Sequence, residues 1–286
     1  MDNLKAKKRH PEEIAVYTAI YVCAAFSVLL LLGIIIYVFA KGARRVNWAF
    51  LTGVTSILHG TVGIAGNILN TLIIILLTMI ITTPIGVGAA IYLNEYAKPG
   101  KLVTVIIFAT ETLAGIPSII FGLFGMLFFG QLCHMGYSLL TGSLTLTLMV
   151  LPLVTRNTPE ALKTVPDSFR TGAVGLGAGK WYTIRTILLP SAMPGIVTGV
   201  ILAIGRIIGE SAALLFTAGS AHLLPKTFNA FLEKIFHSGG TLTIQLYLSA
   251  SKGEFEVAFG IAVVLLVIVL LINFGTKRLA KKLEKH

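Results

Sequence analysis

Long apolar blocks alternate with short polar stretches along this chain. A helix needs about 20 mostly apolar residues to cross the hydrocarbon core of a membrane, and six blocks reach roughly that length. They lie at about 14–40, 67–93, 102–129, 138–155, 193–218 and 255–275. Because backbone polar groups in lipid must be satisfied internally, such blocks form helices. The pattern therefore predicts an all-α integral membrane protein with six transmembrane helices.

The composition agrees with this class of protein. Hydrophobic residues make up 55% of the 286 positions and charged residues only 12%, at a mean hydropathy of +0.87. A soluble domain carries about twice that charged fraction. The first block is too long for the apolar region of a signal peptide, and no small-residue cleavage motif precedes Lys41, so we expect a retained helix. We expect the chain to divide into a tail, first helix and outer loop over 1–66, a transmembrane domain over 67–275, and a basic tail over 276–286.

The distribution of basic residues predicts the orientation. Lys and Arg stay preferentially on the cytoplasmic side, and most of the 23 in this chain do so if both termini are cytoplasmic. Lys41, Arg44 and Arg45 would lie outside and run against this trend. We therefore expect a multi-pass protein of the cytoplasmic (inner) membrane. Its formal net charge of +11 then reflects topology and contact with anionic lipid of the bilayer, and we expect no nucleic acid partner.

The polar stretch at about 156–190 has the most informative pattern. It is too long for a simple turn, so we expect short helices that lie across the cytoplasmic face. Its GLGAGKW sequence is not a P-loop, because Val174 stands where the first glycine belongs and Trp181 where Ser or Thr would bind magnesium. It is not a dinucleotide fingerprint either, because Lys180 occupies the last glycine position. We expect no nucleotide to bind here.

This stretch resembles the cytoplasmic loop of permease subunits in binding-protein-dependent ABC importers. The signature of that loop is E-A-A, three residues, G, nine residues, I, one residue and L-P. The corresponding positions here are Thr171, Gly172, Ala173, Gly177, Ile187, Leu189 and Pro190. Thr171 and Gly172 replace the usual Glu and Ala, and the spacing is intact. The resemblance implies a type I ABC importer permease fold whose coupling loop folds as two short helices around the glycine, with the first docked on an ATPase subunit.

Other stretches narrow the resemblance to phosphate importer permeases. They lie at 82–97, 111–129, 144–162 and 204–219, and GGTLTIQLYLSASKG at 239–253 is similar to PstA rather than PstC members. The resemblance implies a non-enzymatic permease subunit of an ATP-driven phosphate importer, without a cofactor of its own. It also implies three partners: a PstC-like second permease, a PstB-like ATPase dimer that binds ATP and Mg, and an extracytoplasmic PstS-like phosphate-binding protein.

Two other functions stay open. The chain could be the permease of an ABC importer for sulfate, molybdate or phosphonate, because the loop signature alone does not separate these substrates. An ion-coupled transporter or a channel is less favoured, because it predicts inverted repeats with paired broken helices and leaves the long inner stretch unexplained. No histidine or cysteine spacing typical of a metal or catalytic site occurs in the sequence.

Charged residues inside a predicted span are functional candidates, because a charge in the bilayer is costly. Arg206 and Glu210 would lie roughly 18 and 24 Å into the fifth helix, counted from Pro194. Their spacing of four places them on one helical face. Either they form a buried ion pair that fixes helix packing, or Arg206 lines the substrate pathway and offers its guanidinium to phosphate while Glu210 holds it in place. Glu111, near the middle of the third span, is a further pathway candidate.

Two glycine pairs on the fifth span predict close helix packing. Gly195 and Gly199 are four residues apart, and so are Gly205 and Gly209. Small residues at this spacing let two transmembrane helices approach closely. Proline and glycine also occur together at Pro84, Pro117 and Pro194, and we expect the helices to be interrupted there. The backbone groups freed by such a break must be hydrogen-bonded by protein or by a water-filled cavity.

Overall fold

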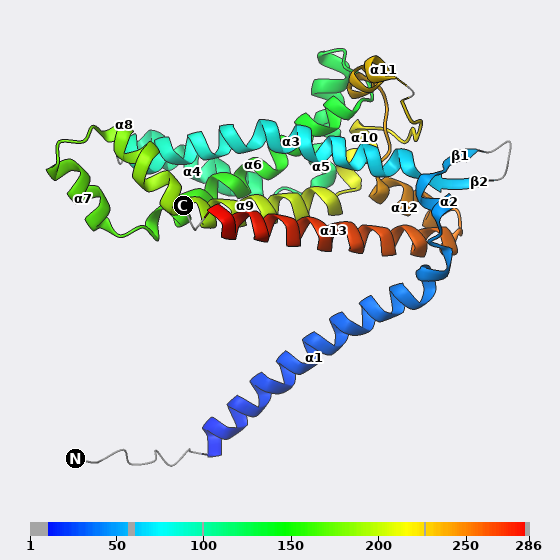
Figure 1. Ribbon diagram of the computed structural model, residues 1–286, viewed down its shortest axis with the longest axis horizontal. Coiled ribbons are helices and arrows are strands. Elements are labelled where there is room, and N and C mark those ends of the chain that lie inside the picture. Colours follow the sequence, from blue (N-terminus) through cyan, green and yellow to red (C-terminus); the bar gives the residue numbers. More distant parts are fainter. Residues whose placement is uncertain (1–10, 57–60, 99, 226, 284–286) are drawn as a thin grey trace.

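The computed structural model describes residues 11–56, 61–98, 100–225 and 227–283 and is almost entirely helical (Figure 1). Five continuous helical runs are long and apolar enough to cross a membrane. Their main helices are α1 (Pro11–Gly42), α3 (Ala65–Ile91), α6 (Leu139–Lys163), α9 (Leu189–Gly209) and α13 (Phe255–Leu283). The helical class and five of the six predicted spans are thereby confirmed.

The third predicted span is a bent pair of helices. It consists of α4 (Lys101–Ala114) and α5 (Ser118–Gly125), which continues as the π-helical turn η3 (Met126–Leu132). The two parts meet at an angle of 102°. Pro117 has an extended backbone and directly precedes the first residue of α5, so the chain changes direction there between the two helices. Helices α3 and α9 do continue through Pro84 and Pro194, so those two expected interruptions are wrong.

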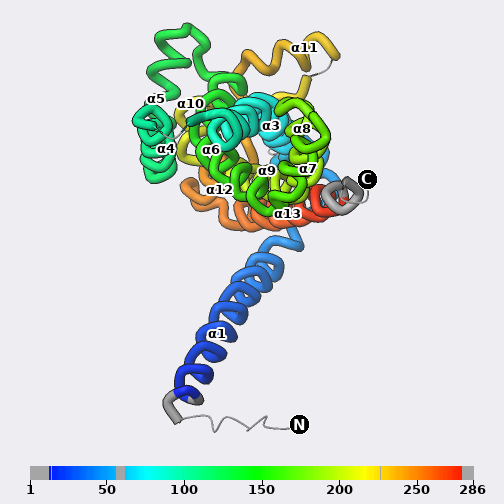
Figure 2. Tube along the Cα trace, turned by 90° about the vertical axis from the view of Figure 1, so that its left-hand side faces the viewer, coloured from blue at the N-terminus to red at the C-terminus, as the bar shows by residue number. Residues whose placement is uncertain are grey.

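Helix α6 lies between α3 and α9 at the centre of the helical body, and α13 packs against the other side of α9 (Figures 1 and 2). Close packing of α6 and α9 depends on two of the predicted glycines. A Cβ atom at Gly195 would lie 2.6 Å from Cβ of Ala161, and one at Gly199 would lie 2.9 Å from Cβ of Asn157. Side chains at these positions would push the two helices apart.

The second glycine pair behaves differently. A Cβ atom at Gly205 or Gly209 would meet no atom within 4 Å. Within the described residues this pair makes no close packing contact, because these glycines lie on the side of α9 that faces away from α6 and α13. That side includes the exposed residues Leu202 and Arg206.

One end of the body carries a small sheet that the sequence did not predict. Strands β1 (Val54–Ser56) and β2 (Thr61–Ile64) pair antiparallel beside the short helix α2 (Trp48–Thr52), which follows the turn η1 (Ala43–Arg45). Phe50, Ile64 and Leu242 are buried together with residues of α13. We call this the hairpin end. The opposite end carries α7 and α8 and the carboxyl end of α13 (Figure 1).

Helix α1 leaves the body and shares little surface with it (Figures 1 and 2). None of its most apolar 18-residue window is buried. It contacts the body near its carboxyl end, where the Tyr37 ring lies edge-on to Phe259 at 5.7 Å between centroids. An apolar helix cannot expose its whole circumference to water, so α1 must be covered by lipid or by another subunit.

The inner stretch is more helical than predicted. Helix α6 extends to Lys163, and α8 (Lys180–Thr183) continues through the π-helical turn η4 (Ile184–Leu188) into α9. The predicted loop at 156–190 therefore shrinks to 164–179, with α7 (Asp167–Gly175) inside it. The run over 180–209 is unbroken because Ile184, Leu188 and Ile196 repeat at helical spacing and bury one side.

The fifth span also ends earlier than predicted. Helix α9 stops at Gly209, and residues 212–217 form the separate helix α10 (Ala212–Thr217). Three short elements complete the chain between α10 and α13: α11 (Phe228–Glu233), η5 (Lys234–Phe236) and α12 (Leu242–Ser251). Helix α10 packs against α5 and α6, so it belongs to the helical body and does not extend α9.

Candidate functional site

Residues 166–183, here called the α7–α8 segment, form two short helices joined by a glycine turn. Pro166 is extended and starts α7, and Asp167 in the first turn stabilises its positive end. Gly177 has φ +79, in the left-handed region that favours glycine. Its N–H donates to the Val174 carbonyl at 2.9 Å, and the next N–H, of Ala178, reaches the Ala173 carbonyl at 2.9 Å. The signature glycine therefore reverses the chain between the two helices.

The α7–α8 segment exposes an unusual amount of apolar surface. Of the α7 residues only Ala173 is buried, and Thr171 and Gly172 beside it are exposed. Five large apolar or aromatic side chains of the segment are also exposed: Phe169, Val174, Leu176, Trp181 and Tyr182. Leu176 alone retains 91% of its accessible surface. Exposed apolar side chains in this number are typical of a surface that contacts another protein or a membrane.

The end of the signature starts the long helix α9. Ile187 and Leu189 are half-buried, and Pro190 is exposed just after the π-helical turn η4. The fully buried positions here are their neighbours Ile184 and Leu188. The signature residues thus fix where the exposed segment joins α9, so a displacement of α8 would move α9 with it.

Arg206 and Glu210 do not share a helical face. Glu210 follows the last residue of α9 with an extended backbone and is buried. Its carboxylate accepts the N–H of Ala213 at 3.0 Å, and its carbonyl accepts the hydroxyl of Thr243 at 2.9 Å. Within the described residues Arg206 forms no ion pair with it. The predicted pair is therefore wrong for this structure, because Glu210 caps α10 instead.

Arg206 lies on the open side of α9. It is exposed together with Leu202, Gly205 and Gly209, one helical turn apart along the same side. A guanidinium within an apolar helix that faced lipid would cost several kcal/mol, so such residues turn toward protein or a water-filled space. This side of α9 is therefore a surface that faces another subunit or an aqueous path.

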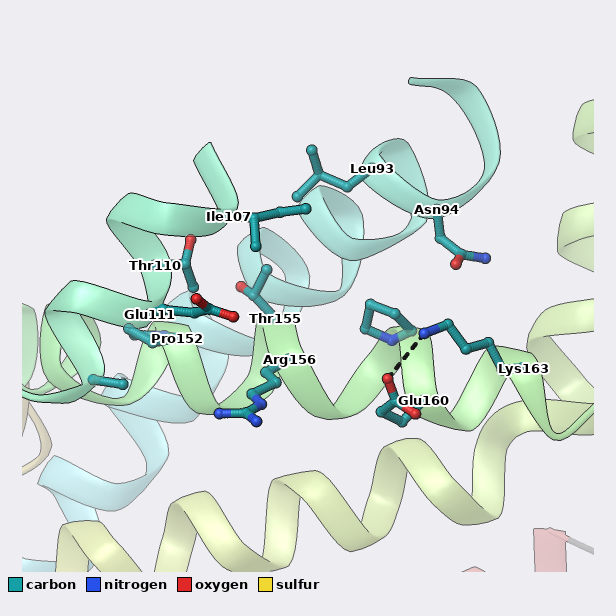
Figure 3. A pocket seen from close by; sticks show the side chains of 12 residues that line it. Leu93, Asn94, Ile107, Thr110, Glu111, Pro152, Thr155, Arg156, Glu160 and Lys163 are labelled. Atoms are coloured by element: carbon teal, nitrogen blue, oxygen red, sulfur yellow. Dashed lines mark hydrogen bonds and ion pairs between the residues drawn. The ribbon is translucent and has the colours of Figure 1, made fainter. Parts of the chain in front are cut away.

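A cavity of about 420 Å³ opens between α4, α6 and the π-helical turn η2 (Tyr92–Tyr96) at the end of α3 (Figure 3). Its polar lining comes largely from α4 and α6. Figure 3 shows Glu111 of α4 directed toward Thr155, with Arg156 next to it on α6 and the Glu160–Lys163 ion pair of 3.0 Å farther along. The cavity thus brings Glu111 together with Arg156, and Arg206 and Glu210 are not part of its lining.

Arg156 is one of the cavity residues that the sequence prediction placed in the inner loop. The structure puts it inside α6, roughly 10 Å before that helix ends. Buried residues continue past it at helical spacing, at Val154, Thr158 and Leu162. This spacing is the sequence signal that would have extended the fourth span and assigned Arg156 to it.

A second feature missed from the sequence is a buried polar network near the hairpin end. The side-chain amide of Asn70 donates to the carbonyls of Ala221 and Gly240, both at 3.0 Å, and that of Asn67 also reaches Gly240 at 3.0 Å. The hydroxyl of Thr71 accepts the N–H of Leu242 at 3.0 Å. The start of α3 is thereby joined to the GGTLT motif at 239–243.

These features define a class: a multi-span membrane protein with a charged cavity between its helices and an apolar docking surface at one end. Residues 82–286 match the family described as binding-protein-dependent transport system inner membrane component. The chain belongs to this family and is a permease subunit of an ABC importer in the inner membrane. Membership implies an ATPase and a substrate-binding protein as partners.

Individual relatives agree with this family. The chain is 36% identical over 273 residues to the probable ABC transporter permease protein YqgI of Bacillus subtilis, covering 92% of this chain and 93% of that protein. It is 35% identical over 246 residues to the phosphate transport system permease protein PstA of Xylella fastidiosa (strain Temecula1), covering 84% and 82%. A chain of the bacterial alginate ABC transporter crystal structure with its alginate-bound periplasmic protein shares the fold, at a TM-score of 0.71 and 14% identity over 96% of each chain.

Proposed function

We propose that this chain is one of two permease subunits of an ATP-driven importer of inorganic phosphate. A PstC-like permease would be its counterpart, a PstB-like ATPase pair would bind ATP and Mg, and an extracytoplasmic PstS-like protein would deliver phosphate. Both termini and the α7–α8 segment would face the cytoplasm. The assignment of phosphate as the substrate rests on one observation, the exposed guanidinium of Arg206 on a membrane-spanning helix. Relatives named for phosphate transport support this assignment.

The chemistry of an arginine suits a phosphate pathway. The guanidinium keeps its charge and presents parallel N–H donors that match two phosphate oxygens. On the open side of α9, Gly205 and Gly209 add no side chains, so a hydrated anion could approach Arg206 closely. Transport also requires release, and the second cationic position, Arg156, shares its cavity with the carboxylate of Glu111. A negative group there would weaken anion binding and favour onward movement.

Movement of the ATPase could reach the substrate pathway at Arg206 because α8, η4 and α9 form one continuous helical run. An ATPase subunit docked on the exposed apolar side chains of the α7–α8 segment would push directly on α8. Helix α8 runs without interruption through η4 into α9. A displacement at Lys180 would therefore be transmitted to Arg206 at the far end of the same rod. A rigid lever of this kind lets a subunit without its own ATP site respond to one that has it.

The proposal is tested by reconstituting the full complex in liposomes and measuring uptake of radiolabelled phosphate, sulfate, molybdate and a phosphonate. We expect ATP-dependent phosphate uptake that the other anions compete with only weakly. Preferential uptake of another anion would overturn the phosphate assignment.

Variants of Arg206 test the pathway role in the same assay. Arg206→Ala is expected to abolish uptake while the complex still assembles. Arg206→Lys is expected to retain part of the uptake, because an ammonium group keeps the charge but lacks the parallel N–H donors of a guanidinium. Arg278→Ala is the control, because that guanidinium stacks on Phe274 at the far end of α13, 4.3 Å from the ring centroid. Normal uptake by Arg206→Ala would refute the role of Arg206.

A further inference from the structure

The π-helical turn η2 (Tyr92–Tyr96), at the end of α3, contacts both halves of the α7–α8 segment. One terminal nitrogen (NH2) of Arg170 in α7 lies 3.1 Å from Oε1 of Glu95. Nζ of Lys180, the first residue of α8, lies 4.8 Å from the centre of the Tyr96 ring. Two residues at the end of one transmembrane helix thus contact one residue on each side of the glycine turn. The signature motif includes none of these four residues.

The Arg170 guanidinium joins three elements. Besides Glu95, it contacts Asp167 of its own helix at 2.9 Å and donates to the carbonyls of Leu162 at 3.3 Å and Val165 at 3.5 Å, at the end of α6. Glu95 is well enclosed, with 11% of its side chain exposed, and it also accepts an N–H of Asn94 at 2.8 Å. A charge-assisted bond between partly buried groups is stronger than one at the surface.

These polar contacts attach α7 to the ends of α3 and α6, and α7 also packs against η4. The helix buries only Ala173, and its large apolar side chains Phe169 and Val174 point into the open. Without the Arg170 contacts, α7 would be free to change its tilt relative to α3. With them, a movement of α7 must displace η2 as well.

Displacement of η2 would act on the cavity. Leu93 and Asn94, the two residues before Glu95, line the cavity that also contains Glu111 and Arg156 (Figure 3). The connection therefore runs from the surface that the ATPase would contact, through Arg170 and Glu95, to the wall of the charged cavity. It adds to the route through α8 and α9, and the contact between Lys180 and Tyr96 joins the two routes at η2.

We infer that Glu95 and Arg170 are positioning residues that couple movement of α7 to the cavity wall and so make ATP hydrolysis productive for import. This inference rests on the proposed function, in which an ATPase subunit docks on the α7–α8 segment. Neither residue contacts substrate in this role. Loss of the ion pair leaves ATPase docking in place and breaks the link to α3.

The test measures ATP hydrolysed per phosphate imported by the full complex in liposomes, for the wild type, Glu95→Gln and Asp167→Asn. Glu95→Gln removes the charge that links α7 to η2. Asp167→Asn removes the other carboxylate from the same guanidinium, within α7, and its side chain is 91% exposed, which makes it the matched control. We expect the ratio to rise at least about fivefold in Glu95→Gln, the lower end of ordinary coupling effects, and to stay unchanged in Asp167→Asn.

The conservative variant Glu95→Asp, which keeps the carboxylate, is expected to hold the ratio closer to the wild-type value than Glu95→Gln does, because the charge that pairs with Arg170 is retained. An unchanged ratio in Glu95→Gln, including an equal fall in hydrolysis and uptake, would overturn the inference, as would a ratio in Glu95→Asp as high as that in Glu95→Gln. If the wild-type complex imports another anion, the proposed substrate fails, and the same ratio measured with that anion still tests the coupling role.

Discussion

Replacement of Gly177 by alanine tests whether the shape of the glycine turn matters for subunit docking. The residue has φ +79, and a Cβ atom there would meet nothing within 4 Å. The substitution therefore adds no clash, and its entire effect comes from the backbone conformation. A side chain in the left-handed region costs about 1–2 kcal/mol.

The magnitude follows from that cost. A penalty of 1–2 kcal/mol changes a conformational equilibrium by a factor of about 5–30. If the docked form of the turn is depopulated by that factor, the apparent Kd for the ATPase subunit rises in proportion. We expect Gly177→Ala to weaken ATPase binding by up to about 30-fold, and Gly177→Asn to weaken it less, because asparagine tolerates this conformation better.

The assay is titration of the detergent-solubilised permease pair with the ATPase subunit. Gly179→Ala is the control: its added Cβ would also meet nothing within 4 Å, but its φ of −68 is ordinary for any residue. Equal affinity for Gly177→Ala and Gly179→Ala would refute the reasoning, because it would mean that the left-handed turn has no part in docking.

Two further predictions concern Asn70, near the start of α3, and Lys234, in the turn η5. Asn70→Ala leaves the carbonyl of Ala221 without this donor and removes one of the two donors to the carbonyl of Gly240. It should lower the stability of the complex by about 1–3 kcal/mol, measured by thermal unfolding in detergent; an unchanged midpoint would contradict this. Burial lowers the pKa of Lys234 below its ordinary 10.5. Between the lowered pKa and 10.5 the unfolded state therefore binds more protons than the folded state. The free energy of unfolding should rise with pH across that alkaline window. Lys234→Met should flatten this rise, and an identical slope in both proteins would exclude Lys234 as its source.

The apolar pattern predicted the helices because lipid leaves the backbone few alternatives. Proline and glycine together predicted three breaks, of which the structure has the one at Pro117, while α3 and α9 continue through Pro84 and Pro194. The angle of the bend was not predictable, because it depends on α5 packing against α10. There a Cβ at Gly122 would lie 2.8 Å from the Cα of Ala213. Residues about 90 positions apart decide that contact.

Two charged residues, Arg156 and Glu210, lie in other elements than the sequence pattern predicted. Arg156 was assigned to a loop because the apolar run stops just before it, although the buried side of α6 continues. Glu210 was assigned to α9 from its spacing to Arg206. Its partners are the N–H of Ala213 and the hydroxyl of Thr243, and the second of these comes from a distant segment that spacing along one helix cannot reveal. The exposure of Arg206 likewise follows only from the three-dimensional packing of α9.

The central claim is that this subunit has no energy source of its own and is driven through the α7–α8 segment. The most direct measurement is affinity purification of the chain with its partners, followed by ATP turnover with and without phosphate and its binding protein. The account predicts a copurified P-loop ATPase whose turnover rises with phosphate and which is lost when residues 166–183 are deleted. Full phosphate-dependent turnover after that deletion, or uptake by the chain without any ATPase, would contradict it.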